Sequence, residues 1–452
     1  MNNLTRRSFL RTSAAAAAAP LILRAPLCGQ HAPSNRLNIA VIGLGNQSRI
    51  HLKNLQGPGE NIIALCDVDE RQIATAKKEN KALAGAKTYR DYRQMLDREK
   101  TLDAVVVATP DHWHTPLCKA LMRAGKHVYC EKPLTHSVGE ARELRQLLKT
   151  CKVVTQMGNQ GSASASLRRS LELIQAGVLG QIREVHASVR DGRNLRRGTV
   201  RPAGADPVPA GFNWDFWCGP APLRPYKEET YHPKIWRGWY DFGCGHLGDF
   251  GCHAFNLPVR ALKLGYPEKI TVSAQGLGTE SYITSGTIEL HFAARPNLAP
   301  VKLVWYDGEV PVAPALFQEV IALRQGNFPG GVVLIGEKGK LFTNSWNGEA
   351  MLMLNGEVRP KDVLFHEPTK GIAASVPRTP SHHEEWIAAC KGGPATYSDF
   401  EVGGQLTEIV LAGLVALRVG HSIDWDGEKM EVRGEPDAKK FIHPAPRPTW
   451  LL

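Results

Sequence analysis

Short apolar runs alternate with helix-forming stretches through the first third of the chain. These runs, dominated by Val, Ile, Leu, Ala and Cys, fall at 36–42, 61–66, 102–109, 127–130 and 152–157. Continuous apolar runs bounded by helical segments are typical of buried strands in a parallel sheet. The pattern therefore predicts an α/β domain with a doubly wound parallel sheet of the Rossmann type over residues 36–157.

Residues 158–452 continue with mixed patterns and are predicted to form a second domain. Strands are predicted at 182–189, at several places within 269–305, and from 332 onwards. Helices are predicted at 245–264, 381–390 and 400–419. The last helix is long and apolar, which indicates that it packs in a core.

The first 32 residues have the layout of an export signal. Paired arginines at 6–7 precede an apolar, alanine-rich run at 14–23, and this arrangement is typical of the twin-arginine route to the periplasm. The run is shorter than the roughly 20 residues that a membrane span requires, so we predict no span. Cleavage is predicted between Ala25 and Ala32. A fraying helical tail is the alternative interpretation, and Cys28 leaves lipidation open.

Composition and charge are those of a soluble enzyme rather than a nucleic-acid binder. Of the 452 residues, 43% are hydrophobic and 22% are charged, as is ordinary for globular proteins. Residues 1–35 hold four arginines and no acid, so only +7 of the formal charge of +11 belongs to the rest. A nucleic-acid binder would concentrate more basic charge on one face, so we expect no nucleic-acid partner.

Eight cysteines follow Cys28, and none of them stands in a C-x-x-C pair. This spacing argues against a structural zinc site and against a thioredoxin-like dithiol. Cys66 and Cys130 fall at predicted strand ends, where a buried free thiol is predicted, although disulfides are permitted outside the cytoplasm.

The first predicted strand runs into a glycine-rich turn with the signature of a dinucleotide site. In the pattern G-x-G-x-x-G, Gly43 supplies the tight turn, Gly45 lets the backbone approach a pyrophosphate, and Ser48 replaces the third glycine. The amide groups that open the next helix, from Asn46 onwards, are then expected to face the phosphates.

An acid follows the second predicted strand. Asp67 stands 19 positions after Ser48, where a carboxylate accepts hydrogen bonds from the adenosine ribose and repels a 2′-phosphate, which favours NAD over NADP. A solvated turn aspartate is the alternative interpretation, and Arg71 keeps NADP open as the less favoured cofactor. Thr109, Glu131 and Lys132 end later strands, so all these groups are expected at one edge of the sheet.

Two motifs carry a family resemblance. Thr109-Pro110 followed by His114, and Ala-Gly-Lys-His-Val-x-x-Glu-Lys-Pro at 124–133, resemble the glucose–fructose oxidoreductase and inositol dehydrogenase family (Gfo/Idh/MocA). The resemblance covers essentially the whole chain after the signal, and Trp236–Gly243 resembles a segment of exported bacterial members. It implies a Rossmann domain followed by an α+β domain with an open, mostly antiparallel sheet, and a homo-oligomer (dimer or tetramer). It also places Thr109, His114 and Glu131 at the cofactor.

Hydride transfer from a secondary alcohol to nicotinamide needs a base for the hydroxyl proton and a cation near the developing alkoxide. The resemblance puts Lys132 in the catalytic group and carries an Asp-x-x-x-His pair onto Asp249 and His253. On the predicted helix these two lie four positions apart, on one face, with His253 as the proton acceptor or donor. A surface lysine in a turn is the alternative for Lys132.

His246 precedes Asp249 by three positions and lies near the same predicted face. The three residues have a spacing that a metal site could use, but hydride chemistry already explains two of them, so no metal is predicted. A capping role in a structural turn is another alternative for His246.

Trp113, Arg190 and His246 are the candidate substrate contacts. Arg190 opens an arginine-rich loop after the strand at 182–189, and such a loop suits a carboxylate or sulfate on a sugar. A solvated or subunit-contact surface is the alternative. The tryptophans between 214 and 239 suit either sugar stacking or core packing.

Together these features predict an exported, nicotinamide-dependent oxidoreductase that acts on a small carbohydrate. A periplasm holds no substantial pool of free NAD, so we expect the cofactor to stay bound and to be recycled. The recycling is expected either as exchange between two sugars or as redox-neutral cleavage of a glycoside. A glycan-binding relative without catalysis is the alternative from another class.

Overall fold

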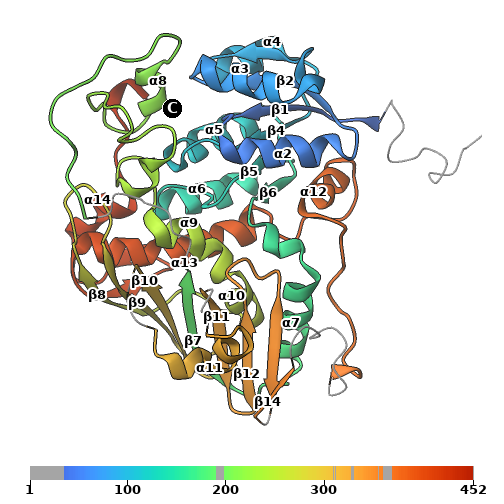
Figure 1. The fold of residues 1–452 in the computed structure, drawn as a ribbon, viewed down its shortest axis with the longest axis vertical. Helices are drawn as coiled ribbons and strands as arrows, with labels where there is room; N and C mark the ends of the chain where they lie inside the picture. The colour runs from blue at the N-terminus through green and yellow to red at the C-terminus, as the bar shows by residue number, and fades with distance from the viewer. Residues whose placement is uncertain are drawn as a thin grey trace, which may run out of the picture. The chain divides into compact units, whose positions relative to one another are not determined.

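The computed structural model describes residues 35–189, 198–308, 310, 312–326, 330–354, 356–359 and 369–450. The predicted signal at 1–32 and Arg190 lie outside these residues. The described chain from Leu37 onwards builds two sheets with buried helices between them (Figure 1).

A six-stranded parallel sheet is built by the N-terminal part of this chain. Its order is β3-β2-β1-β4-β5-β6, which is the doubly wound arrangement. The strands are β1 (Asn38–Ile42), β2 (Asn61–Cys66), β3 (Lys87–Tyr89), β4 (Ala104–Val107), β5 (His127–Cys130) and β6 (Thr155–Met157). The apolar runs predict five of these, whereas β3 carries no such run because Lys87 and Thr88 are exposed.

Helices flank this sheet. They are α2 (Asn46–Gln56), α3 (Glu70–Glu79), α4 (Tyr92–Arg98), α5 (His114–Arg123), α6 (Val138–Leu148) and, from late in the chain, α12 (His382–Cys390). A capping box opens α6: the Glu140 N–H donates to the Ser137 hydroxyl, and the Ser137 N–H donates to the Glu140 carboxylate. Thr115 does not cap α5, because a 3-10 turn at Asp111–Trp113 runs straight into the helix.

The second sheet has ten strands in the order β14-β13-β12-β11-β7-β10-β9-β8-β15-β16. Only β7 and β10 pair in parallel, so the sheet is mostly antiparallel, as the family resemblance implies. The strands are β7 (Ile182–Val189), β8 (Lys269–Gln275), β9 (Ser285–Phe292), β10 (Val301–Asp307), β11 (Gly330–Gly336), β12 (Gly339–Thr343), β13 (Ala350–Leu354), β14 (Glu357–Arg359), β15 (Ile423–Asp426) and β16 (Glu431–Val432).

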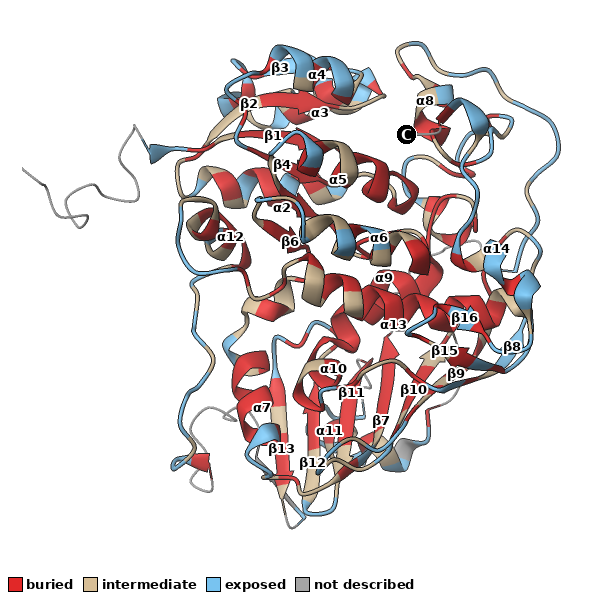
Figure 2. Cartoon of the chain, turned by 180° about the vertical axis from the view of Figure 1, so that it is seen from behind, coloured by how far each residue is buried: buried red, intermediate tan, exposed pale blue. Residues whose placement is uncertain are grey.

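The remaining helices include the long helix that was predicted to pack in a core. They are α7 (Ala165–Gln175), α8 (Trp214–Cys218), α9 (Gly245–Ala254), α10 (Asn256–Ala261), α11 (Pro314–Leu323), α13 (Phe400–Val419) and α14 (Lys439–Ile442). By length and composition α13 could cross a membrane, but it contacts α6, α9 and β8 and is largely buried (Figure 2). The prediction that it packs in the core is confirmed.

Two sequence expectations are refined by the structure. The helix predicted at 245–264 is divided at Phe255 into α9 and α10, because Pro258 has no N–H to donate to the Ala254 carbonyl. The eight described cysteines are free thiols, and Cys66 and Cys130 are buried, as predicted.

Candidate active site

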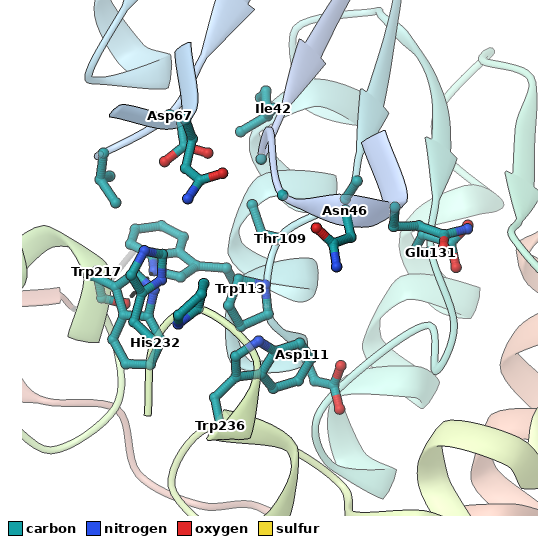
Figure 3. A pocket seen from close by; sticks show the side chains of 18 of the residues that line it. Ile42, Asn46, Asp67, Thr109, Asp111, Trp113, Glu131, Trp217, His232 and Trp236 are labelled. Atoms are coloured by element: carbon teal, nitrogen blue, oxygen red, sulfur yellow. Dashed lines mark hydrogen bonds between the residues drawn. The ribbon is translucent and has the colours of Figure 1, made fainter. Parts of the chain in front are cut away.

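A cavity of about 710 Å³ runs along the carboxyl ends of the parallel strands (Figure 3). The predicted cofactor residues that line it are Gly43, Gly45, Asn46, Asp67, Thr109, Glu131 and Lys132. In Figure 3, Asp67 and Glu131 lie on either side of Asn46 and Thr109. Residues that are far apart in the chain therefore share one elongated space.

The glycine-rich turn shapes one wall of this cavity. Gly43 has φ +85°, and a Cβ there would lie 2.6 Å from the Ala108 carbonyl oxygen, so only glycine fits where β1 passes the end of β4. A Cβ on Gly45 would meet no atom within 4 Å. No side chain caps the start of α2 at Gly45. The backbone here is bare toward the cavity, which suits a pyrophosphate.

Asp67 is held at the rim by the backbone. Its carboxylate accepts hydrogen bonds from the N–H groups of Leu44 (2.7 Å) and Asp69 (2.9 Å). Burial raises the pKa of Asp67 to about 6, against the lowering effect of these bonds. A carboxylate has further lone pairs, so Asp67 can also accept hydrogen bonds from ribose hydroxyl groups. Arg71 is not among the lining residues, because its guanidinium binds Asp69.

Glu131 ends β5 inside a shell of donors that the sequence analysis missed. Its Oε1 accepts hydrogen bonds from Gln47 (3.1 Å) and Gln160 (3.0 Å), and His51 Nε2 lies 3.1 Å away. Burial raises the pKa of Glu131, but His51 and then Lys132 outweigh it and hold the pKa at about 2. The carboxylate is therefore ionised and fixed at the cavity wall.

Lys132 joins the cavity to the second domain. Its Nζ donates to Asp249 Oδ1, and the other Asp249 oxygen lies 3.4 Å from Arg237 Nε. Asp111 lines the cavity nearby and accepts a hydrogen bond from the Cys244 N–H (3.0 Å). Burial raises the pKa of Asp111 to about 7, although Arg237 lowers it. Asp111 stands within the Thr109–His114 motif and Arg237 within the Trp236–Gly243 segment, but neither was singled out from the sequence.

His253 lies behind this group and is 1% exposed. Neither ring nitrogen has a hydrogen-bond partner in the described residues. Burial, and then the charge of Lys132, lower the pKa of His253 to about 3, so the ring is neutral. The expected orientation of His253 by Asp249 is wrong for this structure, because Lys132 and Arg237 engage the Asp249 carboxylate.

The position of α9 depends on close helix packing. A Cβ on Gly251 would lie 2.8 Å from Val410 Cγ1 of α13, so the glycine allows the two helices to approach. This approach places Asp249 against Lys132.

Of three other candidates, His114 and His246 lie away from the cavity, unlike the expectation, and Trp113 lines it. His114 does not line the cavity: its ring nitrogens bind the carbonyl oxygens of Thr109 (3.0 Å) and Pro133 (2.7 Å), which ties two loops together. His246 is also absent from the lining, because it faces Asp307 of β10 at 3.5 Å. Trp113 lines the cavity, and its Nε1 donates to the Trp217 carbonyl (3.0 Å).

No group of three or more His, Cys, Asp or Glu residues in the described chain has a metal-binding arrangement. The three candidate ligands instead contact different residues. His246 lies near Asp307, Asp249 binds Lys132, and His253 packs against Trp346.

Residues 206–243, here called the aromatic segment, close the cavity on the side opposite the strand ends. Its tryptophans pack with one another in a buried cluster, which is the core interpretation of the sequence. Backbone hydrogen bonds join Asn213 to Val68 (2.9 Å) and Glu70 to Gly211 (3.0 Å). His232 lines the cavity and contacts Asp69 at 3.0 Å. Burial opposes ionisation of Asp69, but His232 and Arg71 hold its pKa well below the usual range.

Comparisons with known proteins agree with this geometry. Residues 37–159 match a family model described as an oxidoreductase family with an NAD-binding Rossmann fold, and 164–294 match its C-terminal alpha/beta domain. Residues 3–22 match a twin-arginine translocation signal sequence, which indicates export, typically to the periplasm.

Curated relatives match only part of their length. A myo-inositol 2-dehydrogenase of Thermotoga maritima is 28% identical over 156 residues, 34% of this chain and 46% of the relative. A glycosyl hydrolase family 109 protein of Shewanella sp. strain ANA-3 is 28% identical over 212 residues, 40% of this chain and 45% of the relative. The chain thus spans less than half of these relatives.

The fold matches solved structures over more of the chain. The WlbA dehydrogenase of Bordetella pertussis, solved with NADH and UDP-GlcNAcA, superposes with a TM-score of 0.59 at 17% identity. The match covers 86% of this chain and 99% of that one.

Proposed function

The chain belongs to the Gfo/Idh/MocA family of NAD-binding oxidoreductases, and from that premise we propose that it exchanges hydride with a secondary alcohol of a sugar while retaining its NAD. The observation that carries the proposal is the single cavity that joins Gly43, Gly45 and Asp67 to Lys132. The inositol dehydrogenase relative and the sugar-nucleotide dehydrogenase fold support a sugar-like substrate.

Four features of the cavity fit a dinucleotide. The bare backbone at Gly45 receives the pyrophosphate, and Asp67 receives the adenosine ribose. The buried Thr109 hydroxyl has no hydrogen-bond partner among the described residues and is available to the bound group. Asp67 repels a 2′-phosphate, and Asp69 engages the guanidinium of Arg71, four residues after Asp67, so NAD is favoured over NADP. When bound, nicotinamide supplies the hydride acceptor.

The chain's own residues manage charge and protons. Lys132, held by Asp249, presents an ammonium group to the alkoxide that forms as hydride leaves the sugar carbon. Burial and the charge of Lys132 hold the pKa of His253 at about 3, so its neutral ring is a weak base, and the hydroxyl proton is better accepted by a group whose pKa lies near neutrality. Asp111, with a pKa of about 7, holds an exchangeable proton at the cavity wall.

The aromatic segment suits retention of the cofactor. It faces the ribose-binding Asp67 across the cavity through His232, and Asp69 fastens it to the end of β2. Release of a dinucleotide then requires this contact to open. An exported enzyme that keeps its NAD needs no pool of free cofactor.

Redox-neutral cleavage of a glycoside is a second candidate, favoured by the relative named as a glycosyl hydrolase and by Asp111. Oxidation of a ring hydroxyl to a ketone acidifies the neighbouring C–H. Asp111 in its ionised form accepts that proton and passes it to the departing alcohol. Water then adds to the resulting double bond, and the hydride is returned to the ketone.

Mass spectrometry tests the cofactor directly. Protein purified from its exported location is denatured, and the released small molecules are identified. NAD or NADH is expected in nearly stoichiometric amount. Protein that neither contains nor binds a nicotinamide dinucleotide contradicts both candidate reactions.

Lys132→Met tests the chemistry. The variant is expected to bind NAD and sugar but to lose hydride exchange, because no cation remains for the alkoxide. Lys100→Met, on an exposed side chain, is the control. If Lys132→Met leaves every turnover assay unchanged, the role of Lys132 is wrong, and if wild-type protein binds glycans with no turnover, the chain is a binding relative.

A further inference from the structure

One tryptophan stands apart from the other nine. Trp346 lies on the turn between β12 and β13 and is 47% exposed, whereas the other nine tryptophans are buried. A half-exposed indole leaves apolar surface in water, and tryptophan is enriched at binding interfaces. Trp346 is also the candidate that the sequence analysis overlooked.

The turn that carries Trp346 is firmly anchored. Asn344 Oδ1 accepts hydrogen bonds from the N–H groups of Trp346 (3.2 Å) and Gly348 (2.9 Å). Asn347 is fully buried; its side chain accepts from the Leu257 N–H (3.3 Å), and its carbonyl accepts from the Ser164 hydroxyl (2.7 Å). The turn is thus tied to α10 and to the start of α7, and the indole is presented on a rigid support.

The indole adjoins the catalytic end of the site. Its ring centroid lies 4.3 Å from that of His253 and 5.5 Å from that of Phe250. A Cβ on Gly161 would overlap the Trp346 carbonyl oxygen, so the 3-10 turn Gln160–Ala163 lies directly against the tryptophan. The same turn supplies Gln160, which donates to Glu131 in the cavity wall.

Trp346 is not among the residues that line the cofactor cavity. His253, the group that the indole contacts, is likewise absent from that lining, so the indole meets the site from beside the cavity. If one sugar ring lies over the catalytic lysine, the indole can contact only a neighbouring group of the same substrate. The flat, apolar face of an indole suits the C–H face of a pyranose, whose hydroxyl groups then stay in water.

We propose that Trp346 is a second sugar subsite, which stacks the ring adjacent to the one that is oxidised. The substrate class is then a glycoside of at least two sugar units. This inference rests on the proposed function, because it takes the ring at Lys132 to be a sugar.

The test compares disaccharides with monosaccharides on the NAD-loaded enzyme. The probes are cellobiose, maltose and lactose against glucose and galactose, with binding measured by saturation-transfer NMR and turnover by hydride exchange. The wild type is expected to bind at least one disaccharide about tenfold more tightly than its monosaccharide. Trp346→Ala should remove that advantage by raising the disaccharide KM more than the monosaccharide KM, and Trp346→Phe should restore most of it.

Leu277→Ala, an exposed apolar side chain on another loop, is the matched control and should change nothing. Equal affinity of wild type and Trp346→Ala for every disaccharide overturns the subsite while the proposed function stands. The same holds if Trp346→Ala changes only the oligomeric state, measured by light scattering, since the indole would then belong to an interface between copies. A wild type that loads NAD but neither binds nor oxidises any probe sugar contradicts the proposed function and the subsite together.

Discussion

Adding a methyl group at Gly43 or at Gly45 has different expected effects, although the two glycines are two residues apart. In Gly43→Ala the new Cβ lies 2.6 Å from the Ala108 oxygen, 2.7 Å from its carbonyl carbon and 2.8 Å from the Thr109 nitrogen. Those are backbone atoms of a neighbouring strand end and cannot turn aside. The left-handed φ of +85° costs a further ~1–2 kcal/mol for an L-residue. With overpacking at ~1–3 kcal/mol, the expected loss of unfolding free energy is about 2–5 kcal/mol.

In Gly45→Ala the φ of −68° is ordinary and no atom lies within 4 Å of the new Cβ. The stability cost is at most about 1 kcal/mol, because alanine is a poorer N-cap than glycine. The methyl group instead points into open space beside the cavity, where we place the pyrophosphate. An overlap worth about 1–3 kcal/mol weakens NAD binding roughly 5- to 150-fold.

Urea unfolding of the cofactor-free variants measures the first effect, and calorimetric titration with NAD measures the second. Gly43→Ala is expected to shift the urea midpoint strongly. Gly45→Ala should keep the wild-type midpoint and lose affinity. A Gly45→Ala protein that binds NAD as tightly as wild type would refute the placement of the dinucleotide.

Three further predictions concern protons, buried charge and thiols. Folding raises the pKa of Asp111 from its ordinary 3.8 to about 7, so the folded enzyme holds a proton that the unfolded chain releases, and stability falls as the pH rises through that window. Asp111→Asn should flatten this part of the stability profile, measured by thermal unfolding between pH 4 and 8, and should remove a limb near pH 7 from the rate profile. Glu408→Gln removes the buried carboxylate that binds Arg142 and Arg145 at 2.8 and 2.9 Å. Because Arg145 keeps its ion pair with Glu401 and Arg142 keeps its bond to the Gly427 carbonyl, the expected cost in urea unfolding is about 1.5–3 kcal/mol. The control Glu143→Gln, on the exposed pair with Lys119, should cost under about 1 kcal/mol. Because the eight described cysteines are free thiols, dithiothreitol should leave the melting temperature unchanged, and a drop on reduction would contradict this.

The sequence predicts the cofactor end of the site well, because that end is built by local pattern. A strand end, a glycine turn and an acid at fixed spacing follow one another along the chain, and parallel strands bring Thr109 and Glu131 to the same edge. Contacts with Ala108 require a glycine at position 43, but the glycine motif can be recognised in the sequence without knowledge of those contacts.

The catalytic and substrate end depends on contacts between distant segments, which no local pattern encodes. Asp249 binds Lys132 across 117 positions, and this pairing leaves His253 without the carboxylate expected of it. His114 matches its motif but serves two carbonyl groups instead of the cavity. Trp346 has no motif at all, and its importance follows only from its exposure beside His253. The interruption of the helix at Phe255 follows from Pro258, a local signal that the prediction of one helix at 245–264 did not use.

The Asp69 side chain has two roles that conflict when coenzyme preference is redesigned. A preference for a phosphorylated coenzyme requires a cation beside the adenosine ribose, and Arg71, four residues after Asp67, is one candidate. Liberating that guanidinium means weakening its grip on Asp69, the same carboxylate that receives His232. We therefore expect variants selected for NADP to release their coenzyme more readily. The gain of NADP specificity and the loss of cofactor retention are then coupled.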